Sequence, residues 1–167
     1  MFFRYLFFAC IAFCCFSCGP DYLYKEEKPV AGGQWTYGDT LDFRFSIIDT
    51  AQLYNLYADF EYLDTFPTQN IYLKLYTRFP DGKRVSRVRS MDLFDTEGNS
   101  TGDCSGHACK TRILLQDKAY FNMTGEYAIT LEQFTRIEPL PAINLVGLTV
   151  EKTGVPRGKK WGLIGEQ

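Results

Sequence analysis

Two cysteines and the only histidine of the chain lie within six residues, in the sequence Cys104-Ser-Gly-His107-Ala-Cys109. Thiolate and imidazole are ligands that zinc prefers, but a structural zinc site takes four ligands, usually as pairs on different elements. After Cys18, the chain has no third cysteine and no second histidine to complete such a set. We therefore expect no metal site, and in an oxidising compartment we expect Cys104 and Cys109 to form a disulfide.

Catalysis by a serine or cysteine nucleophile would need a nearby base, and the only imidazole lies in this short turn. Three carboxylates, Asp59, Glu61 and Asp64, cluster in the way that a glycosidase pair would, although their separation in space is not visible from sequence. Their simpler role is the polar outer face of a strand. We expect no catalytic residue and no cofactor.

Three tyrosines fall on strand faces that the alternation directs away from the core. These residues, Tyr57, Tyr72 and Tyr76, could form an aromatic platform for a sugar or a partner protein. They would instead belong to the core if the sheet were covered on both faces. The sequence leaves both interpretations open.

The N-terminus has the layout of a secretory signal peptide. Arg4 precedes an uncharged apolar run, residues 5–16, that is too short to span a bilayer as a helix. Ser17-Cys18-Gly19 favours a lipobox in which Cys18 becomes the acylated N-terminus; Cys10, Cys14 and Cys15 remain alternatives. Several acyl chains would make attachment to the membrane effectively permanent. We expect a cell-envelope protein, held by lipid on the periplasmic side of the inner or outer membrane.

Strand-like alternation recurs through the rest of the chain, between turn-forming residues, with no sustained helical period. It predicts an all-β fold, a single β-sandwich of jelly-roll or immunoglobulin-like type with about seven or eight antiparallel strands. We divide the chain into a signal peptide (1–17), a lipidated tether (18–33), the β-sandwich domain (34–152) and a flexible C-terminal tail (153–167). The expected strands are residues 41–48, 54–63, 70–80, 85–93, 112–116, 126–134 and 143–152.

The charge of the secreted part does not indicate a nucleic-acid partner, and we expect none. Without Arg4, 17 basic residues face 20 acidic ones, a formal charge of −3. The most basic stretch is residues 83–89, Lys-Arg-Val-Ser-Arg-Val-Arg. We interpret it as an exposed edge strand whose charges discourage pairing with other sheets, in preference to a phosphate or lipopolysaccharide patch.

In this order, the pieces resemble the gliding-motility lipoproteins of Bacteroidota known as GldH. The resemblance lies in the lipidated cysteine, the early Trp35, the motif YNLY at residues 54–57 and the sequence FPTQNIYLKLYTRFPDGK at residues 66–83. It continues through Gly-Glu-Tyr at residues 125–127 and the closing INLVGLTVEK at residues 143–152. The chain departs from the family pattern in the loop at residues 98–110 and in Phe134-Thr135-Arg136.

The resemblance implies a membrane-anchored, non-enzymatic component of the gliding machinery, associated with type IX secretion. Its partners would be other gliding and secretion proteins of the envelope, together with the membrane through the lipid. The alternative is a carbohydrate-binding β-sandwich module on the cell envelope, which would show coplanar tyrosines along a groove. A hydrolase is the weakest alternative, because it would need two carboxylates facing each other across a cleft.

Overall fold

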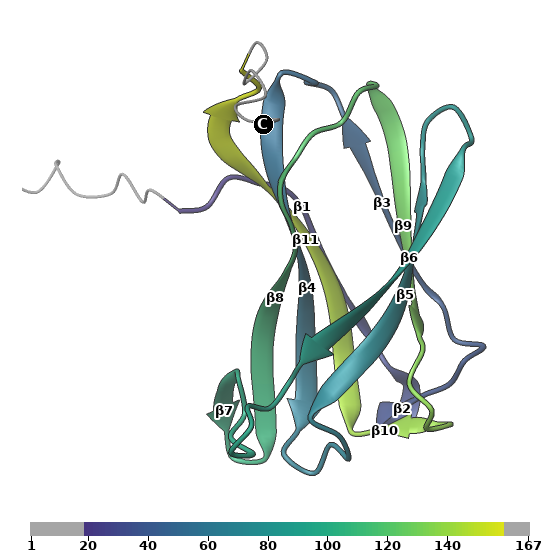
Figure 1. Cartoon of the computed structure of the whole chain (residues 1–167), viewed down its shortest axis with the longest axis vertical. Coiled ribbons are helices and arrows are strands. Elements are labelled where there is room, and N and C mark those ends of the chain that lie inside the picture. Colours follow the sequence, from purple (N-terminus) through teal and green to yellow (C-terminus); the bar gives the residue numbers. More distant parts are fainter. Residues whose placement is uncertain (1–18, 159–167) are drawn as a thin grey trace, which may run out of the picture.

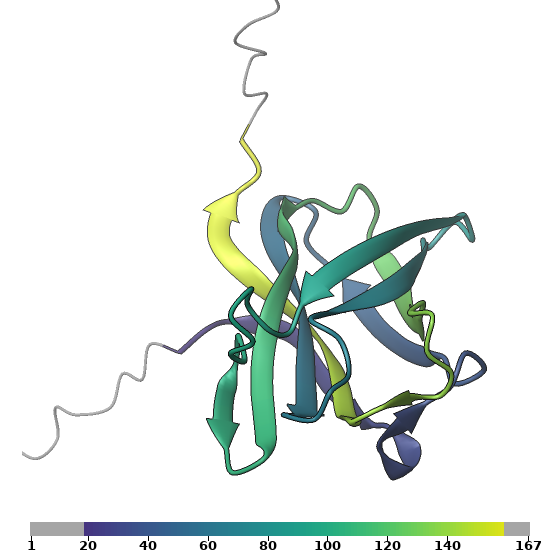
Figure 2. The same ribbon diagram turned by 60° about the horizontal axis from the view of Figure 1, so that its bottom comes forward.

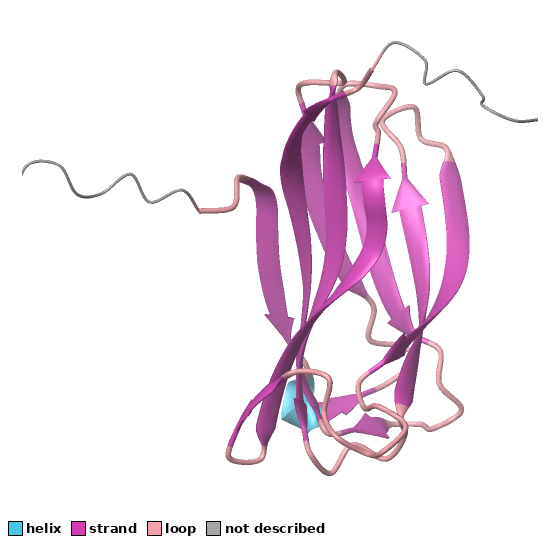
Figure 3. Cartoon of the chain, turned by 60° about the vertical axis from the view of Figure 1, so that its left-hand side comes forward, coloured by secondary structure: helices cyan, strands magenta, loops and turns pink. Residues whose placement is uncertain are grey.

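The computed structural model describes residues 19–158 of the chain. Strands dominate this part, and its one helix is the 3-10 turn η2 (Ala31–Gly33), drawn in cyan in Figure 3. None of its helical structure is long and apolar enough to cross a bilayer. The strands are β1 (Tyr22–Pro29), β2 (Gln34–Trp35), β3 (Leu41–Ile47), β4 (Gln52–Leu63), β5 (Asn70–Arg78), β6 (Arg84–Asp92), β7 (Asp103–Ser105), β8 (Ala108–Ala119), β9 (Gly125–Gln133), β10 (Leu140–Pro141) and β11 (Ile143–Pro156).

Two antiparallel sheets pack face to face (Figure 1). One has the order β1-β11-β4-β8-β7 and the other β3-β9-β5-β6, while β2 and β10 form a small ribbon at one end. The eight long strands pair in a nested way: β1 with β11, β3 with β9, β4 with β8, and β5 with β6. Counted along the chain, the first of these eight strands pairs with the eighth, the second with the seventh, the third with the sixth and the fourth with the fifth. This nested pairing is jelly-roll topology. The predicted all-β sandwich is confirmed, in its jelly-roll form.

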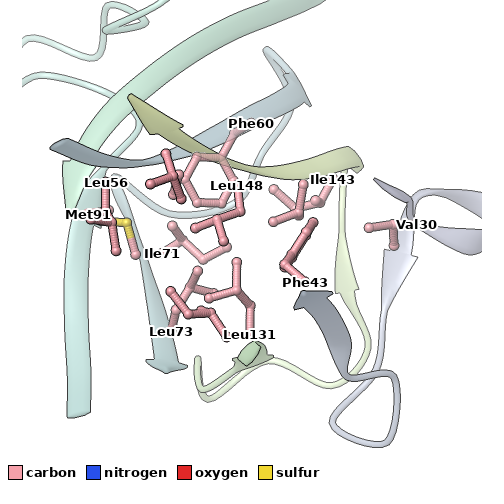
Figure 4. Close-up of a cluster of buried hydrophobic side chains, with 14 of the residues drawn as sticks. Val30, Phe43, Leu56, Phe60, Ile71, Leu73, Met91, Leu131, Ile143 and Leu148 are labelled. Carbon is pink, nitrogen blue, oxygen red and sulfur yellow. The ribbon is translucent and has the colours of Figure 1, made fainter. Parts of the chain in front are cut away.

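The inner faces of the two sheets enclose one hydrophobic core (Figure 4). In β3 the buried residues are Phe43, Phe45 and Ile47, and the polar residues between them are exposed. Phe60 of β4 and Leu148 of β11 reach the same core from the opposite sheet. These are the faces that the alternation predicts, because side chains two residues apart point to the same side of a strand.

Trp35 closes one end of this core. Its side chain is fully buried, and it lies opposite Leu140 where β2 pairs with β10. The indole nitrogen Nε1 donates a hydrogen bond of 2.6 Å to the carbonyl oxygen of Asp39. A buried indole needs such an acceptor, because an unpaired polar group in the core would destabilise the fold.

The folded domain begins earlier than predicted. The prediction of a tether over residues 18–33 is wrong, because β1 pairs with β11 from Tyr22 opposite Glu151 to Pro29 opposite Leu145. The strand lies at the edge of its sheet and is rich in charge, so it carries no apolar alternation. Its backbone pairing with β11, which depends on no side-chain pattern, orders it.

The C-terminal boundary also differs from the expectation. The tail was placed at residues 153–167, but β11 continues to Pro156, which lies opposite Gln52 of β4. β8 is likewise longer than the expected strand at residues 112–116. Residues 159–167 lie outside the described part of the chain.

Substitution Tyr24→Ala tests whether β1 belongs to the fold. Tyr24 is half-buried and its ring centroid lies 5.6 Å from that of Phe45. We expect a loss of about 2 kcal/mol in the free energy of unfolding, measured with urea, because a partly buried aromatic ring loses both burial and packing. The control Ile48→Ala removes a side chain that is 82% exposed and should change stability by less than about 0.5 kcal/mol. Equal stability of the two variants would show that β1 does not pack.

Candidate functional site

The two cysteines of the described chain lie opposite each other in β7 and β8. Cys104 and Cys109 form a disulfide, with their Cα atoms 4.0 Å apart. His107, in the turn between the strands, is exposed, and its Nδ1 lies 2.8 Å from Oδ2 of Asp64. The hydrogen bond and the negative charge of Asp64 raise the pKa of His107 above its ordinary value. Within residues 19–158, no group of three His, Cys, Asp or Glu side chains is arranged to hold a metal ion.

Each carboxylate of the Asp59, Glu61 and Asp64 cluster lies against a cation of β8 or of the turn before it. Glu61 lies directly opposite Lys110, and Oε2 of Glu61 is 3.1 Å from Nζ of Lys110. Asp64 is bound to His107 as described above. Asp59 and Glu61 therefore form cross-strand pairs on one sheet face, while Asp64, just after β4, contacts the turn residue His107. The carboxylates do not face each other across a cleft as a hydrolase would require.

Asp59 makes the most buried of these ion pairs. It lies opposite Arg112, and Nε of Arg112 donates to Oδ1 of Asp59 at 2.5 Å, while the hydroxyl of Thr149 donates to Oδ2. The guanidinium lies over the rings of Tyr22 and Tyr57, at 5.4 and 5.6 Å from their centroids. Burial opposes the charge of Arg112, but the hydrogen bonds to Asp59 and Tyr22 outweigh it, so the pKa of Arg112 is raised. This cluster joins four strands, because Tyr22 lies on β1, Asp59 on β4, Arg112 on β8 and Thr149 on β11.

Gly147 of β11 leaves space for the side chains around this charged cluster. A Cβ atom on Gly147 of β11 would lie 2.9 Å from Cγ of Glu27, 3.0 Å from the carbonyl oxygen of Glu26 and 3.2 Å from Cβ of Asp59. All three contacts are tighter than most Cβ contacts in proteins, so a larger residue here would make its neighbours shift. Gly147 therefore lets β1 and β4 flank β11 closely.

The three candidate tyrosines do not form one platform. Tyr57 belongs to β4 in the five-stranded sheet, whereas Tyr72 and Tyr76 belong to β5 in the four-stranded sheet. Tyr76 is covered by cations, with Nζ of Lys74 5.1 Å and the guanidinium carbon of Arg84 4.5 Å from its ring centroid. Only Tyr72 keeps a broadly exposed ring, with 43% of its surface accessible.

Around Tyr72 lies an exposed and largely apolar surface next to the four-stranded sheet, which we call the Tyr72 surface. Tyr72, Val88 and Phe134 are all exposed there, and they border an open cavity of about 590 Å³. The remaining walls are Thr68, Asn70, Thr135, Arg136 and Ile137. The backbone N–H of Phe134 donates to the carbonyl of Tyr72 at 2.8 Å, so the two aromatic side chains are held on adjacent chain segments.

Phe134-Thr135-Arg136 departs from the family pattern, but the sequence does not predict these residues as part of a site. Val88 is likewise not predicted as a site residue. Strand alternation could have suggested both, since Val88 lies opposite Lys74 on the outer face of β5 and β6. Their proximity to Tyr72 depends on sheet pairing, which alternation does not reveal. Cys18, the expected lipidation site, lies outside the described residues.

Substitution Asp59→Asn tests the buried ion pair. It keeps the shape and a hydrogen-bond acceptor but leaves the Arg112 charge without its counterion, so we expect a loss of about 2 kcal/mol in unfolding free energy. The matched control Glu61→Gln alters the neighbouring, more exposed pair and should cost about 0.5 kcal/mol. Urea denaturation of both variants measures the difference. Similar small losses in both would mean that Asp59 is not structurally required.

Comparison with solved structures adds little. A chain in the structure of infectious bursal disease virus, Gx strain, aligns over 83% of this chain and 33% of its own length, at 12% identity and a TM-score of 0.34. A likeness at this level carries no argument about fold or function.

Sequence comparisons are more informative. The "Gliding motility lipoprotein GldH homolog" of Christiangramia forsetii is 23% identical over 144 residues, which cover 82% of this chain and 88% of that protein. The "Gliding motility lipoprotein GldH" of Flavobacterium johnsoniae is 22% identical over the same length, covering 82% of this chain and 89% of its own. The family model of the GldH lipoprotein matches residues 22–150, from the first residue of β1 to Val150 in β11. The match spans the jelly roll from its first strand to its last, and the chain belongs to the GldH lipoprotein family.

Proposed function

We propose that this protein is a lipid-anchored, non-enzymatic component of the gliding-motility machinery, associated with type IX secretion, and that it acts by binding other envelope proteins. The observation that carries the proposal is the family match over residues 22–150, together with relatives named as gliding motility lipoproteins. The association with type IX secretion comes from the resemblance to that family. The structure adds a candidate for the binding surface.

The Tyr72 surface supports a role in protein binding. Aromatic side chains are enriched at the centres of protein interfaces, and Tyr72 and Phe134 lie there with Val88 beside an open cavity. Arg136 lies at the rim, where it would remain partly solvated. A surface of this composition fits the apolar centre and polar rim of a protein interface.

The outer face of the five-stranded sheet supports the non-enzymatic part of the proposal. Its carboxylates at positions 59 and 61 are paired with cations on the next strand, and the Asp59 pair is largely buried. Acid–base catalysis needs a titratable group that faces a substrate. The paired carboxylates instead hold β4, β8 and β11 together.

Attachment through Cys18 would hold the domain close to the membrane. β1 begins at Tyr22, only four residues after Cys18, and four extended residues span about 14 Å. The end of the sandwich where Tyr22 lies opposite Glu151 would therefore be next to the lipid headgroups. Partners would then be proteins that reach this membrane surface.

The carbohydrate-binding alternative predicts coplanar tyrosines along one groove. Tyr57 lies on a different sheet from Tyr72 and Tyr76, and Tyr76 is covered by Lys74 and Arg84. A sugar platform built from these three residues is therefore not supported by their positions.

Substitution Cys18→Ala tests the anchor. We expect the variant, expressed in a gliding host, to lose acylation and to move from the membrane fraction to the soluble periplasmic fraction, because the acyl chains are attached to this residue. Immunoblots of fractionated cells, with the unsubstituted chain and Cys15→Ala as controls, measure the shift. Retention of the Cys18→Ala variant in the membrane, or release of Cys15→Ala, would show that Cys18 is not the anchor.

The double substitution Val88→Glu and Phe134→Glu tests the Tyr72 surface. In a host lacking its own GldH, we expect this variant to reach the membrane at normal abundance but to restore less than about a tenth of colony spreading, because charge at an interface centre opposes partner binding. Ile48→Glu, which places a carboxylate at another exposed apolar position, should restore spreading fully. Normal spreading with the double variant would exclude the Tyr72 surface as the essential interface.

A further inference from the structure

The four-stranded sheet ends in an edge that the described chain leaves open. β6 pairs with β5 on one side, and no strand of residues 19–158 pairs with its other side. β8 in the opposite sheet is similar, because β7 covers only residues 108–110 and leaves residues 111–119 without a strand on that side. Figures 1 and 2 show β6 and β8 on the same side of the molecule. The sandwich is therefore open along this side.

A groove lies between these two strands. It has a volume of about 360 Å³, and both sheets contribute to its walls. Its apolar part includes the buried residues Leu56, Phe121 and Ile129 and the half-buried Leu75, Phe79 and Leu115. Its polar part includes Thr77, Ser86 and Gln116. The groove therefore gives an added strand access to the edge of the core.

Two arginines of β6 point toward this groove. Arg87 lies opposite Leu75 and Arg89 opposite Leu73, so both project from the same side of β6 as the buried Met91. Both are exposed and line the groove or its rim. Among the described residues, neither has a carboxylate oxygen within 4.0 Å, in contrast to Lys110 and Arg112 on β8. The edge thus offers two positive charges that the fold itself does not neutralise.

We propose that the open edge of β6 accepts an extended acidic segment of a partner protein as an added strand. Side chains of the added strand would alternate, and its inward-facing positions would lie opposite Val85, Arg87, Arg89 and Met91. Carboxylates fit opposite the two arginines, and apolar side chains fit opposite Val85, which lines the groove, and opposite the buried Met91. The partner segment should therefore carry, at every second position, an apolar residue, two acidic residues and another apolar residue, in that order.

The same charges select against a second copy of this chain. Antiparallel pairing of two β6 strands would bring arginines of both copies together, and like charges on paired strands are destabilising. A basic edge therefore does two things at once, because it blocks self-association and favours an acidic strand. This inference does not rest on the gliding proposal, and its test requires no gliding cell.

The probe is a fluorescein-labelled peptide, Val-Thr-Glu-Thr-Glu-Thr-Val, titrated with the full-length lipidated chain in detergent micelles and followed by fluorescence anisotropy. We expect saturable binding that weakens with salt, and protection of the β6 amides from hydrogen exchange. Charge reversal by Arg87→Glu with Arg89→Glu should weaken binding at least about tenfold. The control Lys25→Glu with Lys28→Glu makes the same charge change on β1, the edge strand of the other sheet, and should change affinity less than about twofold.

A peptide with the same composition but a broken pattern, Glu-Glu-Val-Thr-Thr-Val-Thr, separates strand pairing from simple charge attraction. Equal binding of the two peptides, or no protection of the β6 amides, would overturn the proposal, as would a failure of the first peptide to bind. Two further results would contradict the proposal and assign the edge to another partner. If the unsubstituted chain dimerises and the arginine reversal abolishes the dimer, the edge binds a second copy of this chain. If the unsubstituted chain binds phosphatidylglycerol vesicles but no peptide, and the arginine reversal abolishes vesicle binding, the edge binds a membrane surface. Thermal melting of each variant confirms that it is folded.

Discussion

The pairing of β11 with β1 on one side and β4 on the other is the interaction on which the rest of the structure depends. β11 is the longest strand, and its central residues Val146, Leu148 and Val150 are fully buried. On the opposite face, Thr149 binds Asp59, and Gly147 leaves space for Glu27 of β1. One strand thus supplies the core, accommodates the buried ion pair, and orders the charged edge strand that follows the N-terminus.

The outer faces of the two sheets are chemically different. On the five-stranded sheet, charges are balanced between neighbouring strands, and Arg112 is enclosed by Asp59 and two tyrosine rings. On the outer face of the four-stranded sheet, Val88 and Phe134 stay exposed. At its open edge, Arg87 and Arg89, which lie on the inward side of β6, lack acidic partners within the described chain. Unbalanced charge and exposed apolar surface both favour association. We therefore expect partner proteins to bind the four-stranded sheet and its open edge.

Sequence alone predicted the part of the fold that depends on burial. Alternation located β3, β5 and β9 because one face of each contacts the core, but it missed β1, whose order comes from backbone pairing with β11. The site was less predictable for the same reason. The basic run at residues 83–89 was recognised as an edge strand, but the direction of Arg87 and Arg89 toward a groove depends on the register with β5. Likewise, nothing in the local sequence of Phe134 shows that it lies beside Tyr72.

The nested order of strand pairing has a consequence for export. In the proposed N-terminus-first export, β1 would leave the cell interior first and its partner β11 last, and β4 would have no partner on that side until β11 arrives. Contacts between distant parts of a chain form late, since they must first overcome the entropy of closing a long loop. The five-stranded sheet would therefore be completed only after the C-terminal part has crossed. This topology would delay closure of the sandwich until translocation is nearly finished.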